Sequence, residues 1–361
     1  MYKLAILRSI WPNEYRLPLL LEDLLDLPRS YRQKMVFESG YGERFGIDDQ
    51  SIINLGYDVM DRDYLLSNFY HFIILKPTVS DYQAMPRGAV VLGWIHAAQN
   101  KDVIGVAKTK ELTLIALEAC YDQREQHILF ANNRIAGENA VYDAISKIDG
   151  IAKKSSACVI GNGHCGQGAA NQLLRMNIHV DLYTRFPAKE CDGRPLLSYV
   201  TVQKRAQNYL VNDAPIYHQF SQYSIIVNAV KQDILDPTMH VTSKSQLSYM
   251  QPGTLLIDLS CDNGMGFYFA KPTTHSSPIL RVGHVQYYAI DNTPSLTYQK
   301  SSAVISKVLC QYLPAFIKFI SQELPDDIFT AAVEVRSGKV INPDIIRFQC
   351  LDEPCLDKAL Q

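Results

Sequence analysis

Residues 157–170 read Ala-Cys-Val-Ile-Gly-Asn-Gly-His-Cys-Gly-Gln-Gly-Ala-Ala, and the rest of the chain can be placed around them. The apolar run 157–160 is typical of a buried strand, and apolar side chains recur at helical spacing after the glycines. Gly161, Gly163 and Gly166 lie between the two with the spacing G-x-G-x-x-G. A strand, a glycine-rich turn and a helix in this order predict a phosphate-binding turn.

The glycines of this turn have separate tasks in a dinucleotide site. The first permits a tight turn, the second lets the backbone approach a pyrophosphate, and the third lets the helix pack on the strand. Free N–H groups at the start of the helix then bind the anion. Because a second strand, 179–183, follows the helix, we predict a dinucleotide site that includes His164. A purely structural turn is the alternative.

The end of the second strand indicates which dinucleotide binds. Enzymes of this fold that use NAD place an acidic residue about 20 positions after the glycines, on the ribose hydroxyls. Here the strand ends in Tyr183-Thr184-Arg185, without an acid. Arg185 can pair with the 2′-phosphate of NADP and Thr184 can donate to it, whereas a carboxylate would repel it. The sequence therefore predicts NADPH (NADP) as the cofactor; NAD is the alternative if Arg185 points to solvent.

Length and composition limit the classes to which the protein can belong. The 361 residues suffice for two domains, and a formal net charge of −2 gives no indication of nucleic acid or a membrane surface as a partner. The N-terminus lacks the pattern of a signal peptide, and no apolar segment is long enough to span a bilayer. The eight cysteines are scattered, without C-x-x-C or metal-like pairing with histidine. We expect a reduced, cytoplasmic protein without a metal site.

Apolar runs of strand length alternate with helical patterns along the chain. This alternation predicts an α/β fold with two Rossmann-like parallel-sheet domains. The predicted strands are 3–7, 34–37, 57–60, 72–75, 88–94, 102–106 and 128–130 in the first domain, and 157–160, 179–183, 224–230, 253–259 and 285–290 in the second. Besides the helix after the glycines, the predicted helices are 19–25, 52–55, 134–148 and, with Pro314 as the position of a kink, 301–324.

The glycine turn lies in the middle of the chain, so one of the two domains is expected to be discontinuous. We expect residues 132–295 to form the NADP-binding domain, and residues 1–131 with 296–361 to form the substrate domain. The two long helical patterns, 134–148 and 301–324, are interpreted as helices that join the domains. Chemistry is then expected in a cleft between them.

Residues at predicted strand ends are candidates for the site, because ligands of parallel sheets bind beyond the carboxyl ends of the strands. Lys76 and His96 follow two successive strands. An isolated lysine is usually solvated and a lone histidine is usually hydrogen-bonded. Two of them at successive strand ends make a site and the structural interpretation comparable alternatives. In the cofactor domain, Ala229 and Val230 end the strand 224–230 and are predicted cofactor contacts.

Two loops carry further charged candidates. Arg16 lies in the loop after the first strand, where the local sequence favours a solvated surface cation over a clamp for a substrate carboxylate. Asp258 ends an apolar strand and Asp262 opens the loop beyond it. Both aspartates can be turn-formers. As a functional residue, Asp262 would hold an amine or relay a proton at the mouth of the cofactor crevice.

Eight segments together resemble the alanine dehydrogenase / transhydrogenase alpha-subunit superfamily, in the family's order and over nearly the whole chain. Within it, the chain is most similar to the branch of N(5)-(carboxyethyl)ornithine synthases, which reductively join pyruvate to the side-chain amine of ornithine or lysine. The segments are Glu14-Tyr-Arg-Leu-Pro18, Gly40-Tyr-Gly-Glu-Arg-Phe-Gly-Ile-Asp-Asp-Gln50, Leu75-Lys-Pro77, Gly93-Trp-Ile-His96, the glycine turn, 258–264, Lys271-Pro-Thr-Thr274 and Asn292-Thr-Pro-Ser-Leu296.

The resemblance implies a role for each matching residue. Arg16 matches the arginine that binds the keto-acid carboxylate, and Lys76 matches the lysine that polarises the carbonyl, although the prolines beside it do not align cleanly. His96 matches the catalytic histidine and Asp262 the catalytic aspartate. The local sequence favours a solvated surface cation at Arg16, whereas the resemblance implies that Arg16 binds a substrate carboxylate.

Other matches and departures refine the implied activity. Asn292 and Thr293 match the loop that meets the nicotinamide and the substrate, but Thr-Pro-Ser follows Asn292 where alanine dehydrogenases have Met-Pro-Gly. Trp94 stands in the substrate site where they have a tyrosine, Thr184 replaces their ribose-binding acid, and Asn133 stands where a serine is usual. These departures favour the synthase-like branch over simple alanine dehydrogenation.

The implied reaction is an NADPH-dependent reductive condensation of a keto acid, expected to be pyruvate, with the amine of an amino acid such as ornithine or lysine. One alternative is an alanine dehydrogenase-like enzyme whose amine is ammonia. Another is a non-catalytic NADP-binding sensor. The resemblance also implies a homo-oligomer.

Overall fold

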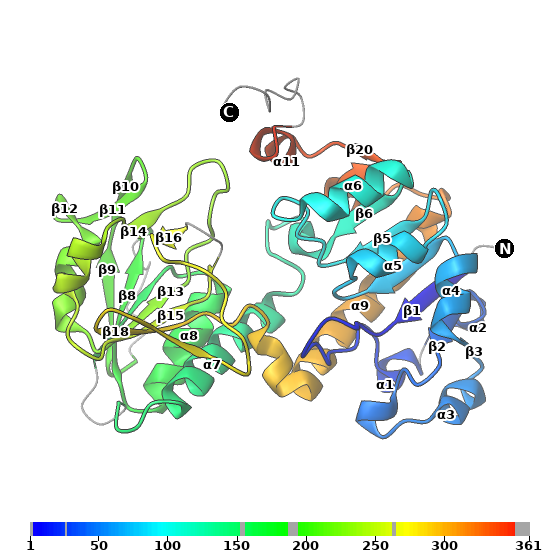
Figure 1. Cartoon of the computed structure of the whole chain (residues 1–361). Coiled ribbons are helices and arrows are strands. Elements are labelled where there is room, and N and C mark those ends of the chain that lie inside the picture. Colours follow the sequence, from blue (N-terminus) through cyan, green and yellow to red (C-terminus); the bar gives the residue numbers. More distant parts are fainter. Residues whose placement is uncertain (1–2, 26, 152–155, 187–193, 262–264, 351–361) are drawn as a thin grey trace. The chain divides into compact units, whose positions relative to one another are not determined.

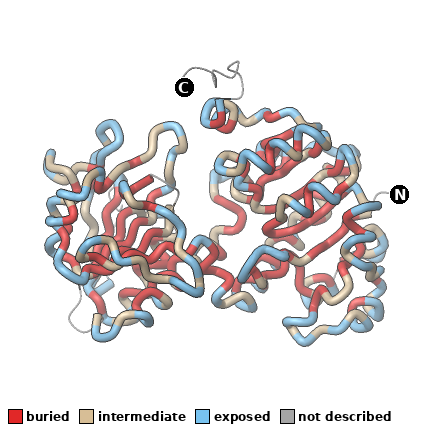
Figure 2. The backbone as a smooth tube through the Cα atoms, viewed as in Figure 1, coloured by how far each residue is buried: buried red, intermediate tan, exposed pale blue. Residues whose placement is uncertain are grey.

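A computed structural model describes residues 3–25, 27–151, 156–186, 194–261 and 265–350. The chain divides into two compact units (Figure 1). Unit 1 comprises Met1–Leu129 with Tyr298–Gln361, and unit 2 comprises Phe130–Thr297. In each unit the central strands are buried (Figure 2). The predicted α/β class is confirmed, and each unit is described separately below.

Unit 1 is built on a sheet with the strand order β20-β19-β6-β5-β4-β1-β2-β3. Strands β1 to β6 pair in parallel, and β19 and β20 are added to the β6 edge in antiparallel orientation. The order 3-2-1-4-5-6 of the parallel strands is that of a doubly wound sheet. The strands are β1 Leu4–Leu7, β2 Met35–Glu38, β3 Asp58–Met60, β4 His71–Ile74, β5 Val90–Gly93, β6 Thr113–Ala116, β19 Val333–Arg336 and β20 Lys339–Val340.

Helices cover both faces of this sheet, and the longest of them is α9, Tyr298–Ile320. By length and composition alone the helical stretch Thr293–Ile320, which includes α9, is apolar enough to cross a membrane, but Ile305, Leu309, Leu313 and Phe316 on α9 are buried in the unit 1 core. Its apolar character is thus explained by packing. The other helical segments are α1 Leu21–Leu24, α2 Arg29–Arg32, η1 Glu43–Phe45, α3 Asp49–Asn54, α4 Arg62–Asn68, α5 Val79–Ala84, α6 Lys101–Thr109, η2 Leu117–Ala119, α10 Asp327–Ala331 and α11 Pro343–Phe348.

Unit 2 repeats the doubly wound order in its own sheet, β17-β18-β15-β13-β7-β8-β9. All neighbouring strands pair in parallel except β17, which forms an antiparallel hairpin with β18. The strands of this sheet are β7 Ser156–Ile160, β8 His179–Thr184, β9 Leu197–Thr201, β13 Ile225–Asn228, β15 Leu255–Asp258, β17 Ile279–Val282 and β18 Val285–Tyr288. Smaller strands are β10 Gln203–Arg205, β11 Asn208–Val211, β12 Ala214–Pro215, β14 Met239–Val241 and β16 Gly266–Phe267.

Two long helices of unit 2, α7 Phe130–Ser146 and α8 His164–Arg175, pack closely against each other. A Cβ added at Gly168 of α8 would lie 2.0 Å from the Arg134 carbonyl oxygen, and one at Gly137 of α7 would lie 1.9 Å from the Cys165 carbonyl oxygen. Glycine at both positions therefore lets the two backbones approach each other. The remaining helical segments of unit 2 are η3 Ile216–Gln222, η4 Lys244–Tyr249 and η5 Thr293–Thr297.

Two predicted strands are wrong. Residues 102–106 lie within helix α6, which Asn100 caps by accepting a hydrogen bond from the Val103 N–H, 3.2 Å. Their β-branched run suggests a strand, but Val103, Ile104 and Ala107 form one buried helical face. Residues 128–130 form a turn and the first residue of α7. In place of these two runs, β6, β19 and β20 complete the sheet of unit 1, and β19 pairs with β6 from a distant part of the chain.

The close approach of α7 and α8 generates a prediction. Gly168→Ala should lower the unfolding temperature by several degrees, because the added methyl meets backbone that must move. Gly105→Ala in α6 is the matched control: Gly105 is exposed, no atom in the described part of the chain lies within 4 Å of its added Cβ, and alanine is the better helix former. Thermal unfolding followed by circular dichroism measures both variants. Equal unfolding temperatures for the two would contradict the packing explanation.

Candidate functional site

The glycine turn lies at the topological switch point of the unit 2 sheet, where β7 is flanked by β8 and β13. Ligands of such sheets bind at this point, beyond the carboxyl ends of the strands. Gly161 has φ +108°, and a Cβ there would lie 2.6 Å from the Ala229 carbonyl oxygen. At Gly166 a Cβ would lie 1.9 Å from the Gly161 carbonyl oxygen, whereas a Cβ at Gly163 would meet no atom of the described residues within 4 Å. The turn is thus tight on its inner side and open at Gly163, which fits a pyrophosphate at the start of α8.

Predicted cofactor contacts surround this turn. His164 is the first residue of α8, and burial and the charge of Arg134 lower the pKa of its imidazole. The Ala229 N–H donates to the Ile160 carbonyl oxygen, 2.8 Å, which ties the ends of β13 and β7 together. Val230 is buried beside it. The structure therefore brings these residues to the two strand ends that flank the switch point.

The two residues predicted to recognise the 2′-phosphate lie at the end of β8 and differ in exposure. Thr184 is buried, and its hydroxyl donates to the Phe186 carbonyl oxygen, 3.0 Å, and accepts from the Phe186 N–H, 3.2 Å. Arg185 is exposed, with its guanidinium 5.6 Å from the Phe186 ring centre. Arg185 is therefore the better placed of the two to meet an anion, and Thr184 shapes the turn that carries it.

A buried polar cluster, consisting of Asn228, His240, Asp258 and Tyr287, lies at the ends of β13 and β15. The Asp258 carboxylate accepts from the Asn228 amide, 2.9 Å, and from the Tyr287 hydroxyl, 2.8 Å. His240 Nε2 lies 3.2 Å from the Asn228 amide oxygen, and burial lowers the pKa of His240 to about 3, so the ring is neutral. Asp258 is therefore an acceptor for buried donors, not merely a turn-former.

The loop after β15 carries the predicted catalytic aspartate. Asp258 fixes the start of this loop by accepting from the Ser260 N–H, 3.1 Å. Asp262 itself lies outside the described residues, so its role stays a prediction.

The segment Asn292-Thr293 is buried at the start of η5. His275 Nε2 lies 2.8 Å from the Asn292 amide oxygen. The Thr293 hydroxyl donates to the Ala136 carbonyl oxygen on α7, 3.0 Å, while the Asn139 amide donates to the Thr293 carbonyl oxygen, 2.9 Å. These bonds fix the loop on α7, within unit 2.

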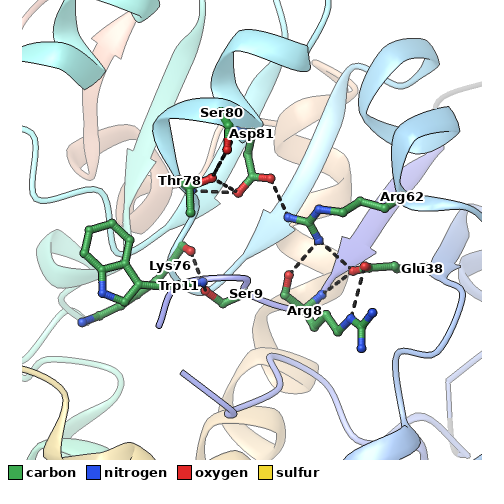
Figure 3. Close-up of polar contacts among 9 residues, drawn as sticks. All are labelled: Arg8, Ser9, Trp11, Glu38, Arg62, Lys76, Thr78, Ser80 and Asp81. Atoms are coloured by element: carbon green, nitrogen blue, oxygen red, sulfur yellow. Dashed lines mark hydrogen bonds and ion pairs between the residues drawn. The ribbon is translucent and has the colours of Figure 1, made fainter. Parts of the chain in front are cut away.

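In unit 1 the corresponding switch point lies between β1 and β4. Of the predicted site residues, Arg16 lies in the loop after β1 and Lys76 in the loop after β4. The Ser9 hydroxyl donates to the Lys76 carbonyl oxygen, 2.6 Å, and accepts from the Trp11 N–H, 3.2 Å (Figure 3). Lys76 is buried, and its Nζ lies 5.9 Å from the centre of the Trp11 ring. The loop after β1 and the loop after β4 are thereby joined.

A cavity of about 330 Å³ opens beside this loop. Its wall is formed by residues 8–17 together with Gly40, Tyr41, Arg44 and Phe45. Its volume is at the lower end of the range for small-molecule sites. Three arginines, Arg8, Arg16 and Arg44, are part of this wall, so the cavity suits an anionic ligand.

Arg16 is not the solvated surface cation that its local sequence favoured. Its side chain is 3% exposed, and its guanidinium donates to both Glu14 carboxylate oxygens, at 2.7 Å from Nε and 2.5 Å from Nη2. The Trp94 ring centre lies 4.5 Å from its Cζ. Burial alone would raise the pKa of Glu14, but the charges of Arg16 and Lys76 and the hydrogen bonds from Arg16 lower it. The structure thus brings Arg16, Lys76 and Trp94 into one charged cluster.

His96 lies in the loop after β5 with φ +47°, and more than half of its side chain is exposed. The Glu118 carboxylate accepts from the backbone N–H groups of Ile95, 3.2 Å, and His96, 2.6 Å. His96 Nδ1 lies 3.8 Å from the same carboxylate. Glu118 therefore fixes the left-handed turn that presents the imidazole. Sequence analysis missed Glu118, because β6, the strand that precedes it, was not predicted and its contacts with residues 95 and 96 form only on folding.

A second set of charges that sequence analysis missed holds the start of the cavity wall (Figure 3). The Glu38 carboxylate accepts from the Arg8 N–H, 3.0 Å, and from the Arg62 guanidinium, 2.9 Å. Arg62 also donates to Asp81, 2.6 Å, whose carboxylate caps α5 by accepting from the Thr78 N–H, 2.8 Å. This network connects β2, α4 and α5 to the loop after β1.

Glu334 on β19 is a buried carboxyl near Glu118. Burial and the charge of Glu118 raise the pKa of Glu334 from 4.5 to about 8. Among the described residues, no hydrogen-bond partner meets its Oε2. The carboxyl is therefore protonated at neutral pH in the folded protein, whereas it is ionised in the unfolded chain.

This difference predicts how stability depends on pH. The folded state retains a proton that the unfolded chain loses above about pH 4.5, so the contribution of Glu334 is present at acidic pH and is lost as pH rises to about 8. Glu334→Gln should unfold at a higher temperature than wild type at pH 8, with the gap closing toward pH 5. The exposed Glu22→Gln is the control and should follow wild type. A gap that does not change between pH 5 and pH 8 would contradict this assignment.

The chain is similar to known proteins over both units. Residues 5–135 match the family described as alanine dehydrogenase/PNT, N-terminal domain, and residues 132–343 match alanine dehydrogenase/PNT, C-terminal domain. An N(5)-(carboxyethyl)ornithine synthase of Lactococcus lactis subsp. lactis (strain IL1403) is 25% identical over 329 residues, which cover 86% of this chain and 95% of that protein. An alanine dehydrogenase of Mycolicibacterium smegmatis is 22% identical over 371 residues, which cover 96% of each.

Solved structures share the fold. An L-alanine dehydrogenase superposes with a TM-score of 0.75 at 17% identity, covering 96% of this chain and 99% of that one. A transhydrogenase from Sinorhizobium meliloti superposes with a TM-score of 0.71 at 21% identity, covering 94% and 99%. Together with the family matches over residues 5–343, these findings show that the chain belongs to the alanine dehydrogenase/PNT family of NAD(P)-dependent oxidoreductases.

Proposed function

We propose that this enzyme joins a keto acid, with pyruvate as the expected one, to the amine of an ornithine- or lysine-like amino acid at the expense of NADPH. In the balanced reaction, the keto acid, the amine, NADPH and a proton give an N-(1-carboxyethyl) amino acid, NADP⁺ and water. The observation that carries the proposal is the cavity in unit 1, whose wall contains three arginines. Condensation of a keto acid with an amino acid brings two carboxylates into the site, each of which a guanidinium can pair with, whereas pyruvate with ammonia brings only one.

The residues of unit 2 fit the cofactor. The glycine turn and the start of α8 would hold the pyrophosphate, and exposed Arg185 would pair with the 2′-phosphate. Ala229, Val230 and the Asn292-Thr293 loop would contact the nicotinamide end. When bound, NADPH supplies the hydride that reduces the imine carbon.

The residues of unit 1 would bind and prepare the keto acid. Arg16, fixed by Glu14, would orient the carboxylate, and the Lys76 ammonium would polarise the carbonyl that the amine attacks. The keto acid would lie against Trp94, which already contacts Arg16. Burial of this cluster strengthens each of these electrostatic effects, because few waters screen it.

Proton transfer is assigned to His96. The attacking amine must be neutral, the departing water needs a proton, and the imine accepts hydride best when it is protonated. An imidazole has one nitrogen that can donate a proton and one that can accept it, so the exposed ring of His96 can serve both as acid and as base. Glu118 orients the loop that carries it. Asp262 would stabilise the cationic imine by charge complementarity.

The wider setting is also part of the proposal. The partners are small molecules, a keto acid and an amino acid, without nucleic acid or a membrane, and the chain is proposed to act in the cytoplasm as a homo-oligomer. The competing candidate is alanine dehydrogenation, in which the amine is ammonia. The similarity to an alanine dehydrogenase supports it.

Product analysis separates the two activities. With purified enzyme, NADPH and pyruvate, ornithine or lysine should yield an N-carboxyethyl product by mass spectrometry, and ammonium should yield little alanine. Rates are followed by NADPH oxidation, with pyruvate omitted as the control. Alanine as the main product, formed faster than with any amino acid, would leave alanine dehydrogenation as the function. No turnover with any amine would favour an NADP-binding sensor.

The exposed cation at the end of β8 predicts cofactor choice. NADPH should give a higher kcat/KM than NADH, and Arg185→Asp should shift the ratio of the two toward NADH by about ten- to a hundredfold, because a charge-assisted contact is replaced by repulsion. Arg281→Asp makes the same charge change on the exposed side of β17 and should leave the ratio unchanged. Equal use of both cofactors by wild type would refute the charge argument.

A further inference from the structure

Among the three arginines of the cavity wall, Arg44 differs from the other two in its partners. Arg16 is held by both oxygens of Glu14. Arg8 faces Glu38, with 3.2 Å between Nε and Oε1, and Glu43, at 3.8 Å. Arg44 is exposed, and within the described part of the chain no Asp or Glu oxygen lies within 4.0 Å of its guanidinium. Its positive charge is therefore available to a ligand.

Aromatic rings hold Arg44 in place. Its Cζ lies 3.9 Å from the centre of the Tyr15 ring, which is a close cation–π contact. Tyr15 in turn packs edge-on against Tyr298 of α9, with 5.9 Å between ring centres, and Phe45 packs against the same ring at 5.4 Å. Stacking restricts the guanidinium plane without neutralising it, so its donors stay available and less side-chain entropy is lost on binding.

The backbone of this loop is restricted as well. A Cβ at Gly42 would lie 2.7 Å from the Ile47 Cβ and 2.8 Å from the Ile47 carbonyl oxygen, so the turn before Arg44 is tight. Gly46 closes η1 with φ +72°. Arg44 is thus carried on a short, folded segment that packs on the aromatic rings, which places its cation at a fixed point of the wall.

We propose that Arg44 binds the carboxylate of the amino acid that supplies the amine, and so selects amino acids over simple amines. This inference rests on the proposed condensation. The keto acid is assigned to the buried Arg16 and Lys76, and the second carboxylate of the reaction then needs a cation in the same cavity. Guanidinium pairs with carboxylate through two parallel hydrogen bonds. Among the three cavity arginines, Arg44 is the one with no carboxylate of the described residues within 4.0 Å. A diamino acid anchored by its carboxylate leaves its side-chain amine to react.

The experiment pairs a change in the protein with a change in the substrate. Wild type and Arg44→Gln are assayed with pyruvate, NADPH and either lysine or lysinamide, in which the carboxylate is replaced by a neutral amide. Wild type should prefer lysine by up to about fivefold in kcat/KM, because an exposed ion pair contributes up to about 1 kcal/mol. In Arg44→Gln this preference should disappear, while the KM values for pyruvate and NADPH stay within twofold of wild type.

Arg29→Gln is the matched control, because Arg29 is an exposed arginine of unit 1 on α2 and does not line the cavity. It should keep the wild-type preference. Arg44→Lys keeps the charge without the planar donor pair and should keep part of the preference. Unfolding temperatures close to wild type would exclude a loss of folding as the cause.

The outcomes separate this inference from the reaction on which it rests. If the N-carboxyethyl product forms and Arg44→Gln keeps the wild-type preference for lysine, Arg44 is not the anchor and the condensation stands. If alanine is the main product, the condensation fails. In that case, or without turnover, calorimetric titration of lysine and lysinamide decides: a preference for lysine that Arg44→Gln abolishes supports the anchor, and equal or absent binding overturns it.

Discussion

The buried ion pair between Glu14 and Arg16 is the interaction on which the cavity of unit 1 depends. Both side chains are nearly inaccessible, and the Glu14 carboxylate also accepts from the Arg16 backbone N–H, 3.1 Å. A buried pair of charges is tolerated only when its geometry and hydrogen bonds are complete, and removal of one partner leaves the other uncompensated at a loss of about 3–5 kcal/mol. Tyr15 lies between the paired residues in the sequence, so the ion pair fixes the backbone that carries the ring on which Arg44 stacks.

The two units use the same arrangement to concentrate polar groups. In each, the first strand lies between the second and the fourth, and loops that leave these strands in different directions carry the candidate residues. Such topology places polar side chains at strand ends without interrupting the buried strands. In unit 1 the loops join through Ser9 and Lys76, and in unit 2 through Ala229 and Ile160. The charge differs: the unit 1 cavity wall is rich in arginine, whereas the unit 2 turn presents backbone.

Much of this arrangement could be predicted because its signals are local. The glycine spacing, the apolar runs and the polar residues directly after them lie within a few positions of each other. The wrong strand at 102–106 shows where local signals fail, since a β-branched run is compatible with both a strand and the buried face of a helix. Arg16 was ambiguous because Trp94, which covers it, is distant in sequence. Glu118 and Arg44 were missed for the same reason: their contacts exist only after folding.

The discontinuity of unit 1 also has a consequence for synthesis on the ribosome. Unit 2 is continuous, so its sheet can form as soon as residues 130–297 have emerged. Unit 1 cannot close its core until α9 arrives, and β6 remains an open edge until β19 is made. For this interval the nascent chain exposes apolar side chains and unpaired backbone, the two features that promote aggregation. The synthesis of α9 and β19 therefore determines when unit 1, which contains the cavity, no longer exposes the surfaces through which it could aggregate with other chains.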